Sequence, residues 1–461
     1  MLHCLEVTTR NSAGGGKRRR RLAVVLGLVL APVVVAQVTT APVSPNNAPV
    51  DPGVRGGAPG AGKPFATGLT PGDLAFFNNI GTPTFAEVEA VQDGLGPRFN
   101  FNSCGGCHVF PALGGSSPLT NPQVTQAPLI APGNRIPPFL SINGPVREVR
   151  FVRNPDGSAD GGVHDIFTIV GRADNPSGCS ISQPDFSNTG NMIFRIPTPL
   201  FGDGLIESIT DTTIKNNIAS DPFGLKRLMG ISGHVNSSGN DGTVTRFGWK
   251  AQNKSLLIFA GEAYNVEMGV TNEAFTNERE EDPKCATNKL SESSTGFDSG
   301  NSPADIVAFM GFMRMLDQPT PSCGVAGAPA CSSSVNNGKN LFNTIGCQLC
   351  HTPTLTTGLS TIAALNHVNA NLYSDLGLHA MGSGLADNVS QGNASGSEFR
   401  TAPLWGLGQR VFFLHDGRTK DLLQAILQHD NPGSEATRVL NIFEALPNSA
   451  KQDILNFLRS L

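Results

Sequence analysis

The chain has 461 residues and a formal net charge of −4 at pH 7, and only 15% of its residues are charged. It therefore lacks the basic surface that holds a phosphate backbone, and we exclude nucleic acid as a partner. The length suggests two or three domains, of which we expect two, and the 53 glycines and 33 prolines indicate long loops.

Residues 1–36 have the three parts of a cleaved export signal. A basic run from Lys17 to Arg21 is followed by an apolar stretch from Leu22 to Val35 and by Ala36 at the expected cleavage site. The apolar stretch is shorter than the roughly 20 residues that a helix needs to cross a membrane, so we expect no stable membrane span. The mature chain is predicted to be periplasmic, and residues 37–67 to form a flexible linker rich in proline, glycine and alanine.

The pattern Cys-x-x-Cys-His occurs twice, from Cys104 to His108 and from Cys347 to His351. At this spacing two thiols reach the two vinyl groups of a haem while the next imidazole reaches its iron. A zinc site or a redox dithiol would not explain two copies in an exported chain. We therefore predict two covalently bound c-type haems, attached through Cys104, Cys107, Cys347 and Cys350 and ligated by His108 and His351.

The pattern of apolar residues around the two motifs indicates a mainly helical fold. We expect helices, in chain order, near Leu74–Phe77, Thr84–Val91, Glu207–Ile218, Ile306–Leu316 and Ala450–Leu461. Long irregular stretches between Pro111 and about Thr243 contain strand-like segments at Val146–Val152 and Ile166–Val170, which favour a small β-sheet in an insertion. The two motifs predict two cytochrome c-like domains, residues 68–320 and 334–461, joined by a linker at residues 321–333.

Four of the nine cysteines remain once Cys4 leaves with the signal and four others attach haem. In an oxidising compartment they can pair in three ways. We favour a bridge between Cys323 and Cys331, because the loop between them is short and rich in glycine and proline. Cys179 and Cys285 would then pair by elimination.

Two haem motifs followed by His415-Asp416-Gly417 resemble the bacterial dihaem cytochrome c peroxidase superfamily. Other segments are similar to its dihaem thiol oxidoreductase branch, among them Arg246-Phe-Gly-Trp-Lys-Ala, Phe399-Arg-Thr-Ala-Pro-Leu-Trp-Gly-Leu-Gly and Leu414-His-Asp-Gly-Arg. The resemblance covers nearly the whole mature chain. It implies two haem domains and a redox activity, with peroxide as the default substrate.

For the C-terminal haem, the resemblance implies an axial ligand on the helix that follows the His-Asp-Gly turn. The peroxidases have a methionine there, and the matching position in this chain is His429. Ligation by two histidines should lower the haem potential relative to a histidine and a methionine. Met381 is the runner-up ligand, and His429 could instead be a solvent-facing helix residue.

For the N-terminal haem, the resemblance implies that Trp249 bridges the two haems and that Glu267 moves protons on bound peroxide. Their alternatives are core packing for Trp249 and a surface carboxylate for Glu267. Phe259 stands where the peroxidases have a glutamine, and no histidine follows the first motif closely. Met268 or His164 could ligate this iron, or the iron could be five-coordinate and open.

The resulting interpretation is a periplasmic dihaem oxidoreductase with the N-terminal haem as substrate site and the C-terminal haem as electron-transfer site. Its partners would be a periplasmic electron donor or acceptor protein and a small oxidant such as peroxide. Two alternatives are a non-enzymatic dihaem electron carrier and a thiol or sulfur-compound oxidoreductase. The resemblance also implies calcium between the domains, but Arg410 to Phe413 does not match the peroxidase pattern, so its ligands cannot be assigned.

Overall fold

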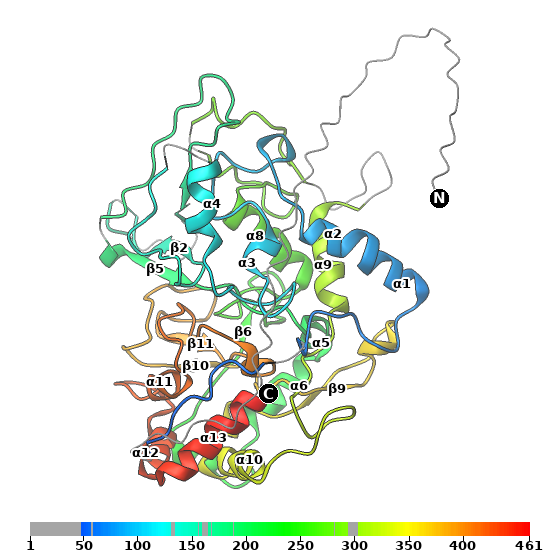
Figure 1. Ribbon diagram of the computed structural model, residues 1–461, viewed down its shortest axis with the longest axis vertical. Coiled ribbons are helices and arrows are strands. Elements are labelled where there is room, and N and C mark those ends of the chain that lie inside the picture. Colours follow the sequence, from blue (N-terminus) through cyan, green and yellow to red (C-terminus); the bar gives the residue numbers. More distant parts are fainter. Residues whose placement is uncertain are drawn as a thin grey trace, which may run out of the picture. The chain divides into compact units, whose positions relative to one another are not determined.

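The computed structural model describes residues 48–56, 59–130, 134–154, 156–158, 165–166, 168–187, 189–280, 282–293 and 303–461 (Figure 1). The predicted signal, Cys4 and His164 lie outside these residues. In the described part, none of the helices has both the length and the apolar character that a bilayer crossing requires.

Short helices dominate the first two thirds of the chain. They are α1 (Pro71–Phe76), the π-helical turn η1 (Phe77–Gly81), α2 (Thr82–Phe85), the 3₁₀ turn η2 (Val91–Asp93), α3 (Cys104–Cys107), α4 (Pro122–Ile130), the 3₁₀ turn η3 (Thr189–Asn191), α5 (Asp203–Ser208), α6 (Asp211–Ala219), α7 (Leu225–Met229), α8 (Leu256–Met268) and α9 (Asp305–Met315). The helix predicted at Glu207–Ile218 is divided, because Ile209 and Thr210 are extended and the Thr210 side chain caps α6. The helix predicted at Thr84–Val91 ends at Phe85, so that expectation was wrong beyond its first turn.

The remaining third also combines short helical turns with longer helices. They are α10 (Ser333–Ile345), η4 (Cys347–Leu349), η5 (Ala363–Leu365), η6 (Leu407–Gln409), α11 (Leu422–Leu427), α12 (Thr437–Ala445) and α13 (Asn448–Ser460). α10 and α13 pack closely on each other, and Gly338 allows this because a Cβ there would meet the backbone of Asp453. α13 confirms the predicted terminal helix.

The β-structure is small, as expected. One antiparallel sheet has the order β3 (Asp165–Ile166), β2 (Glu148–Phe151), β5 (Met192–Arg195), with Val149 opposite both Ile166 and Phe194. The other strands form antiparallel pairs: β1 (Arg98–Phe99) with β4 (Ile169–Val170), β6 (Asn236–Ser237) with β7 (Val244–Thr245), β8 (Leu355–Thr356) with β9 (Asn369–Ala370), and β10 (Leu378–Ala380) with β11 (Glu398–Arg400). The prediction of a mainly helical fold with a small sheet in the insertion is thus confirmed.

Two buried apolar clusters form most of the core, and each has one pair of motif cysteines packed against it. The first, built on α8, α9 and the segments near α1 and α2, contacts Cys104 and Cys107. The second, built on α10 to α13, contacts Cys347 and Cys350. Five buried apolar residues of the segment 355–376 belong to the first cluster, namely Leu355, Leu365, Ala370, Leu372 and Leu376, whereas Tyr373 belongs to the second. The described residues form one compact unit. The domain boundaries at residues 320 and 334 stay a prediction.

Both predicted disulfides are present. Cys179 is bonded to Cys285 and Cys323 to Cys331, which confirms the pairing favoured from the short glycine- and proline-rich loop. In the described chain, the free cysteines are the four of the two Cys-x-x-Cys-His motifs.

Candidate functional site

The first motif places a neutral imidazole at the wall of a large cavity. α3 carries Cys104 and Cys107, and His108 follows directly at its C-cap. The Nδ1 of His108 lies 2.9 Å from the carbonyl oxygen of Thr198 and 3.2 Å from that of Gly115. Burial lowers the pKa of His108 to about 4, so Nδ1–H donates to these carbonyls and Nε2 keeps its lone pair. Backbone carbonyls that accept from the other ring nitrogen impose this arrangement on a metal-ligating histidine.

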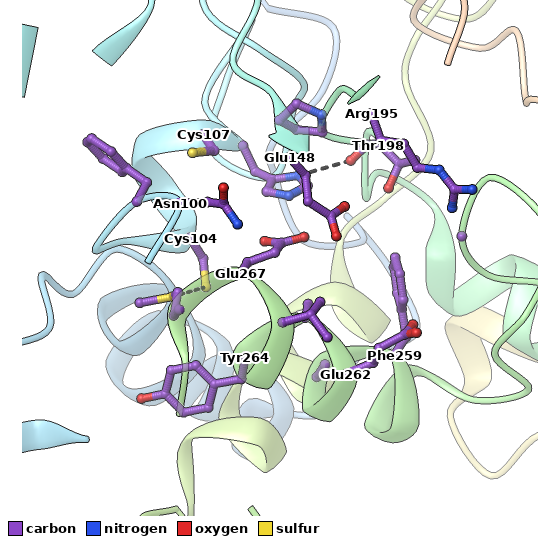
Figure 2. A pocket seen from close by; sticks show the side chains of 18 of the residues that line it. Asn100, Cys104, Cys107, Glu148, Arg195, Thr198, Phe259, Glu262, Tyr264 and Glu267 are labelled. Atoms are coloured by element: carbon purple, nitrogen blue, oxygen red, sulfur yellow. Dashed lines mark hydrogen bonds between the residues drawn. The ribbon is translucent and has the colours of Figure 1, made fainter. Parts of the chain in front are cut away.

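The cavity beside this motif has an empty volume of about 1070 Å³ and is bounded on its other side by α8. Figure 2 shows the carboxyl groups of Glu267, from α8, and Glu148, from β2, both pointing into it. Glu148 is held by Arg150, whose guanidinium nitrogens lie 2.6 and 2.8 Å from one carboxylate oxygen. Glu148 was missed by sequence reasoning, since a strand residue in an irregular insertion carries no local signal of facing a cavity.

Two further predicted residues lie around this first cavity. Phe259 lines it and stacks on Phe247, with ring centroids 5.7 Å apart. Its side chain has no polar hydrogen, so the wall at this point cannot donate a hydrogen bond. Met268 also lines the cavity, and its sulfur lies 3.9 Å from the sulfur of Cys104. Met268 is therefore placed beside a thiol of the first motif.

The second motif is built in the same way. His351 directs Nδ1 to the carbonyl oxygen of Tyr373 at 3.1 Å. Burial, with the nearby His429 adding to it, lowers the pKa of His351 to about 4, so this imidazole is also neutral with Nε2 available. The adjoining cavity, with an empty volume of about 1430 Å³, is lined mostly by apolar side chains, among them side chains of α10 to α13.

Both candidate distal ligands of the C-terminal site line this second cavity. His429 follows α11, and its Nδ1 lies 2.9 Å from the carbonyl oxygen of Ala425. Burial lowers the pKa of His429, so its ring presents a neutral Nε2 in the same manner as His351. Met381, the runner-up, follows β10 and lines the same cavity.

His379 lines the second cavity as well, but both of its ring nitrogens are engaged. Its Nε2 lies 2.9 Å from Asp375 and its Nδ1 2.8 Å from Glu435, and the Cys350 sulfur is 3.7 Å from Nδ1. Burial opposes the charged ring, but Cys350 and the two carboxyls raise the pKa of His379 well above its usual value. Both ring nitrogens are thus taken up by contacts with carboxyl oxygens, so neither presents a lone pair to the cavity. Sequence reasoning did not single out this cluster.

Trp249 lines both cavities. Its indole N–H donates to the carbonyl oxygen of Ile196 at 3.0 Å, which fixes the ring. The ring centroid lies 6.4 Å from that of His415, which in turn stacks on Phe399 at 4.3 Å. Both His415 and Phe399 line the second cavity, so a short series of rings connects the two cavities.

Three buried charged groups also lie between the cavities. Asp387 accepts hydrogen bonds from Arg195 at 2.8 Å and from Lys250 at 3.0 Å. Arg195 lines the first cavity, whereas the Lys250 ammonium lies 4.2 Å from the centroid of Phe399 at the wall of the second. This cluster ties together segments of the chain that are far apart in sequence.

No other metal site is indicated. Among the described residues, no group of three or more histidine, cysteine, aspartate or glutamate side chains is arranged to hold an ion. The calcium ion implied by the resemblance stays a prediction without assigned ligands. The remaining candidate, His164, cannot be placed because it lies outside the described residues.

Residues 150–461 match a protein family described as "Di-haem oxidoreductase, putative peroxidase". None of the curated proteins matches the chain significantly. Among solved structures, the chain is similar to hydrazine synthase of Kuenenia stuttgartiensis (16% identity, 35% of this chain and 58% of that one, TM-score 0.23). It is also similar to a MauG-like protein associated with microbial copper homeostasis (15%, 63% and 95%, TM-score 0.28) and to the diheme peroxidase BthA of Burkholderia thailandensis (14%, 63% and 92%, TM-score 0.29). The chain thus spans little more than half of the hydrazine synthase chain.

Proposed function

Because the chain belongs to the di-haem oxidoreductase family, we propose that it is an exported dihaem c-type cytochrome with a peroxidase-like activity. In this proposal the N-terminal cavity is the substrate site and the C-terminal cavity exchanges electrons with a periplasmic protein. The observation that carries the proposal is the repeated arrangement of a Cys-x-x-Cys-His motif at the edge of a large cavity, with Trp249 in the wall of both.

The residues at both cavities fit a covalently bound haem. Cys104 and Cys107 would hold one and Cys347 and Cys350 the other, since these four thiols are free and half-buried beside apolar walls. The two histidines of the motifs, His108 and His351, present a neutral Nε2 because their Nδ1–H groups are tied to backbone carbonyls. Bound haem would supply a redox-active iron and, where an axial position is open, a binding site for a small oxidant.

In the N-terminal cavity, Glu267 is proposed to hold and move protons at its carboxyl oxygens. It lies on α8 and points into the cavity, where a low dielectric makes proton transfer by a carboxyl group effective (Figure 2). Glu148 provides a second carboxylate, positioned by Arg150. Phe259 excludes water from the same wall and donates no hydrogen bond, which favours a slower peroxide reaction than in a peroxidase with a glutamine there.

In the C-terminal cavity, His429 is proposed as the second axial ligand. As in His351, a hydrogen bond from Nδ1 to a backbone carbonyl leaves Nε2 of His429 neutral and available. Ligation from both sides leaves no position for a substrate and suits electron transfer, at a potential lower than that of histidine and methionine ligation. Trp249 is proposed to carry electrons between the cavities.

The test is spectroscopy on protein purified from a host that matures c-type cytochromes. We expect two haems per chain that survive denaturation, one high-spin signal that shifts with cyanide or peroxide, and one low-spin signal that does not. His429→Ala should convert the low-spin signal to high-spin, whereas the matched Met381→Ala should not. Two low-spin signals that do not change on addition of cyanide or peroxide would instead identify an electron carrier. Fewer than two bound haems per chain would refute the proposal altogether.

A further inference from the structure

A buried tyrosine beside the N-terminal cavity is held between two carboxyl groups. The hydroxyl of Tyr264, on α8, lies 3.0 Å from Glu89 and 3.0 Å from Asp305, the first residue of α9. Tyr264 is 1% exposed and Glu89 is 4% exposed, so bulk water does not take the place of these contacts.

The Tyr264 hydroxyl has too few hydrogens to donate to both carboxyl groups. A phenol donates one hydrogen, so it can satisfy one carboxylate and can only accept from the other group. The second 3.0 Å contact is a hydrogen bond only if one carboxyl is protonated. Burial and the neighbouring Asp305 raise the pKa of Glu89 to about 8, and Glu87 and Asp93 add to this effect. The pair therefore holds one proton at neutral pH, and its ionised member is a strong proton acceptor for the phenol.

The cluster is connected to the first haem motif by a series of aromatic rings. The ring of Tyr264 is 5.1 Å from that of Phe309, which is 6.1 Å from Phe85, which is 6.2 Å from His108. Tyr264, Phe309 and Phe85 all line the N-terminal cavity. Figure 2 shows the hydroxyl of Tyr264 directed away from the cavity, so the ring faces the haem site while the hydroxyl faces the acids.

The chain has only two tyrosines, and the second one, Tyr373, shows how a tyrosine near a motif lies without carboxyl partners in the part of the chain that the structure describes. Tyr373 lies next to the C-terminal site, where its carbonyl oxygen accepts from His351. Its ring packs against Phe342 and Phe457. In the structure as described, its hydroxyl has no carboxyl partner. Burial raises the pKa of Tyr373, and none of the described carboxylates contacts its hydroxyl to accept the proton.

We propose that Tyr264 is a redox-active residue of the N-terminal site, which gives one electron to an oxidised haem in that cavity and its phenolic proton to the adjoining carboxylate. The O–H bond of the phenol breaks, an O–H bond forms on Asp305, the ionised member of the pair, and a neutral tyrosyl radical remains. When an electron returns to the ring, the proton returns with it. The carboxyl pair makes this possible, because losing an electron without a proton would leave a cation in a buried site. This inference rests on the proposed function in one respect, the presence of haem in the N-terminal cavity.

The test uses the holoprotein, freeze-quenched after mixing with hydrogen peroxide and, separately, with the one-electron oxidant hexachloroiridate(IV). Electron paramagnetic resonance should detect a tyrosyl radical that narrows when the protein is grown with ring-deuterated tyrosine. The signal should persist in Tyr373→Phe and be lost in Tyr264→Phe at equal haem content. Asp305→Asn keeps the phenol but removes the ionised member of the carboxyl pair, and we expect a large loss of the same signal.

An equal signal in Tyr264→Phe, or no tyrosyl signal with either oxidant, would overturn the inference. Infrared spectra give a second check that needs no oxidant: a protonated carboxyl band at pH 7 should vanish in Glu89→Gln, and its absence from the wild type would also overturn it. If peroxide leaves the haem spectrum unchanged while hexachloroiridate produces the Tyr264 signal, the proposed peroxidase activity fails and the inference stands. If both oxidants change the haem spectrum but produce no tyrosyl radical, the inference fails and the proposed peroxidase activity stands.

Discussion

Removal of the Asp387 carboxylate should destabilise the protein far more than removal of an ordinary ion-paired aspartate. Asp387 is 1% exposed and pairs with Arg195 and Lys250, whose side chains are 3% and 0% exposed. In Asp387→Ala both cations stay buried without their shared partner, and the backbone N–H of Val389 loses its acceptor. Breaking a buried pair by removing one partner costs about 3–5 kcal/mol.

The two cations differ in how they can respond. Arg195 cannot lose its proton, so it bears the full cost of being unpaired. Lys250 can, because burial already lowers its pKa to about 8 while Asp387 is present. Without that carboxylate its pKa falls further below that of the unfolded chain, so the unfolded state binds more protons and stability rises with pH. We therefore expect a loss of about 4 kcal/mol at pH 7 and a smaller loss at pH 9.

Urea denaturation of the holoprotein, followed by circular dichroism at both pH values, measures these differences. The matched control is Asp241→Ala, which removes an exposed ion pair with Lys254 and should cost less than about 1 kcal/mol. Similar losses in the two variants, or a loss in Asp387→Ala that does not shrink with rising pH, would show that this buried cluster is not held together by charge.

Three further predictions follow from the same structure. Trp249→Phe should slow electron exchange between the haems, measured by stopped-flow absorbance. The control is Trp405→Phe, which should leave the rate unchanged because Trp405 lines neither cavity. Equal rates in the two variants would show that Trp249 does not carry the electrons. Because burial lowers the pKa of His415 to about 4, the folded chain binds fewer protons than the unfolded chain below about pH 6.5. Stability should therefore fall on acidification from about pH 6.5 to 4, by up to about 3 kcal/mol, and a His415→Phe variant with the same slope in denaturant titrations would contradict this. Replacing Cys179 and Cys285 by serine should cost about 2 kcal/mol more than replacing Cys323 and Cys331, because chain entropy grows with sequence separations of 106 and 8; thermal unfolding that ranks the pairs the other way would contradict the entropic account.

The sequence was most informative where the chemistry is contiguous along the chain. Each Cys-x-x-Cys-His motif occupies five successive positions, so its spacing alone predicts which side chains face one haem. The structure places each motif at a large cavity, and Trp249, Glu267 and His429 lie in the cavity walls, whereas their roles stay predictions. The short loop between Cys323 and Cys331 likewise predicted its own disulfide.

The sequence was least informative where the partners of a residue are distant along the chain. His379 is set between Asp375 and Glu435, and nothing near Glu435 indicates that contact. Partners distant along the chain also explain why the helix predicted at Thr84–Val91 ends at Phe85. Glu89 donates its backbone N–H to Asn102 and its carboxyl lies 3.0 Å from the hydroxyl of the buried Tyr264, so tertiary contacts hold the segment in place of helical ones.

The difference in chemistry between the two cavities must arise from the walls opposite the motifs. Both motifs supply the same ligand set, two cysteines and a histidine with its Nδ1 bound to a carbonyl, so they cannot distinguish one haem from the other. Opposite the first motif, α8 brings the carboxyl of Glu267, which in the proposed function moves a proton and leaves the iron accessible. Opposite the second, the end of α11 brings the imidazole of His429, which in the proposed function would compete with any substrate for the iron. A division into a substrate site and an electron-transfer site therefore requires only that α8 and α11 carry different side chains, with no change in how haem is attached.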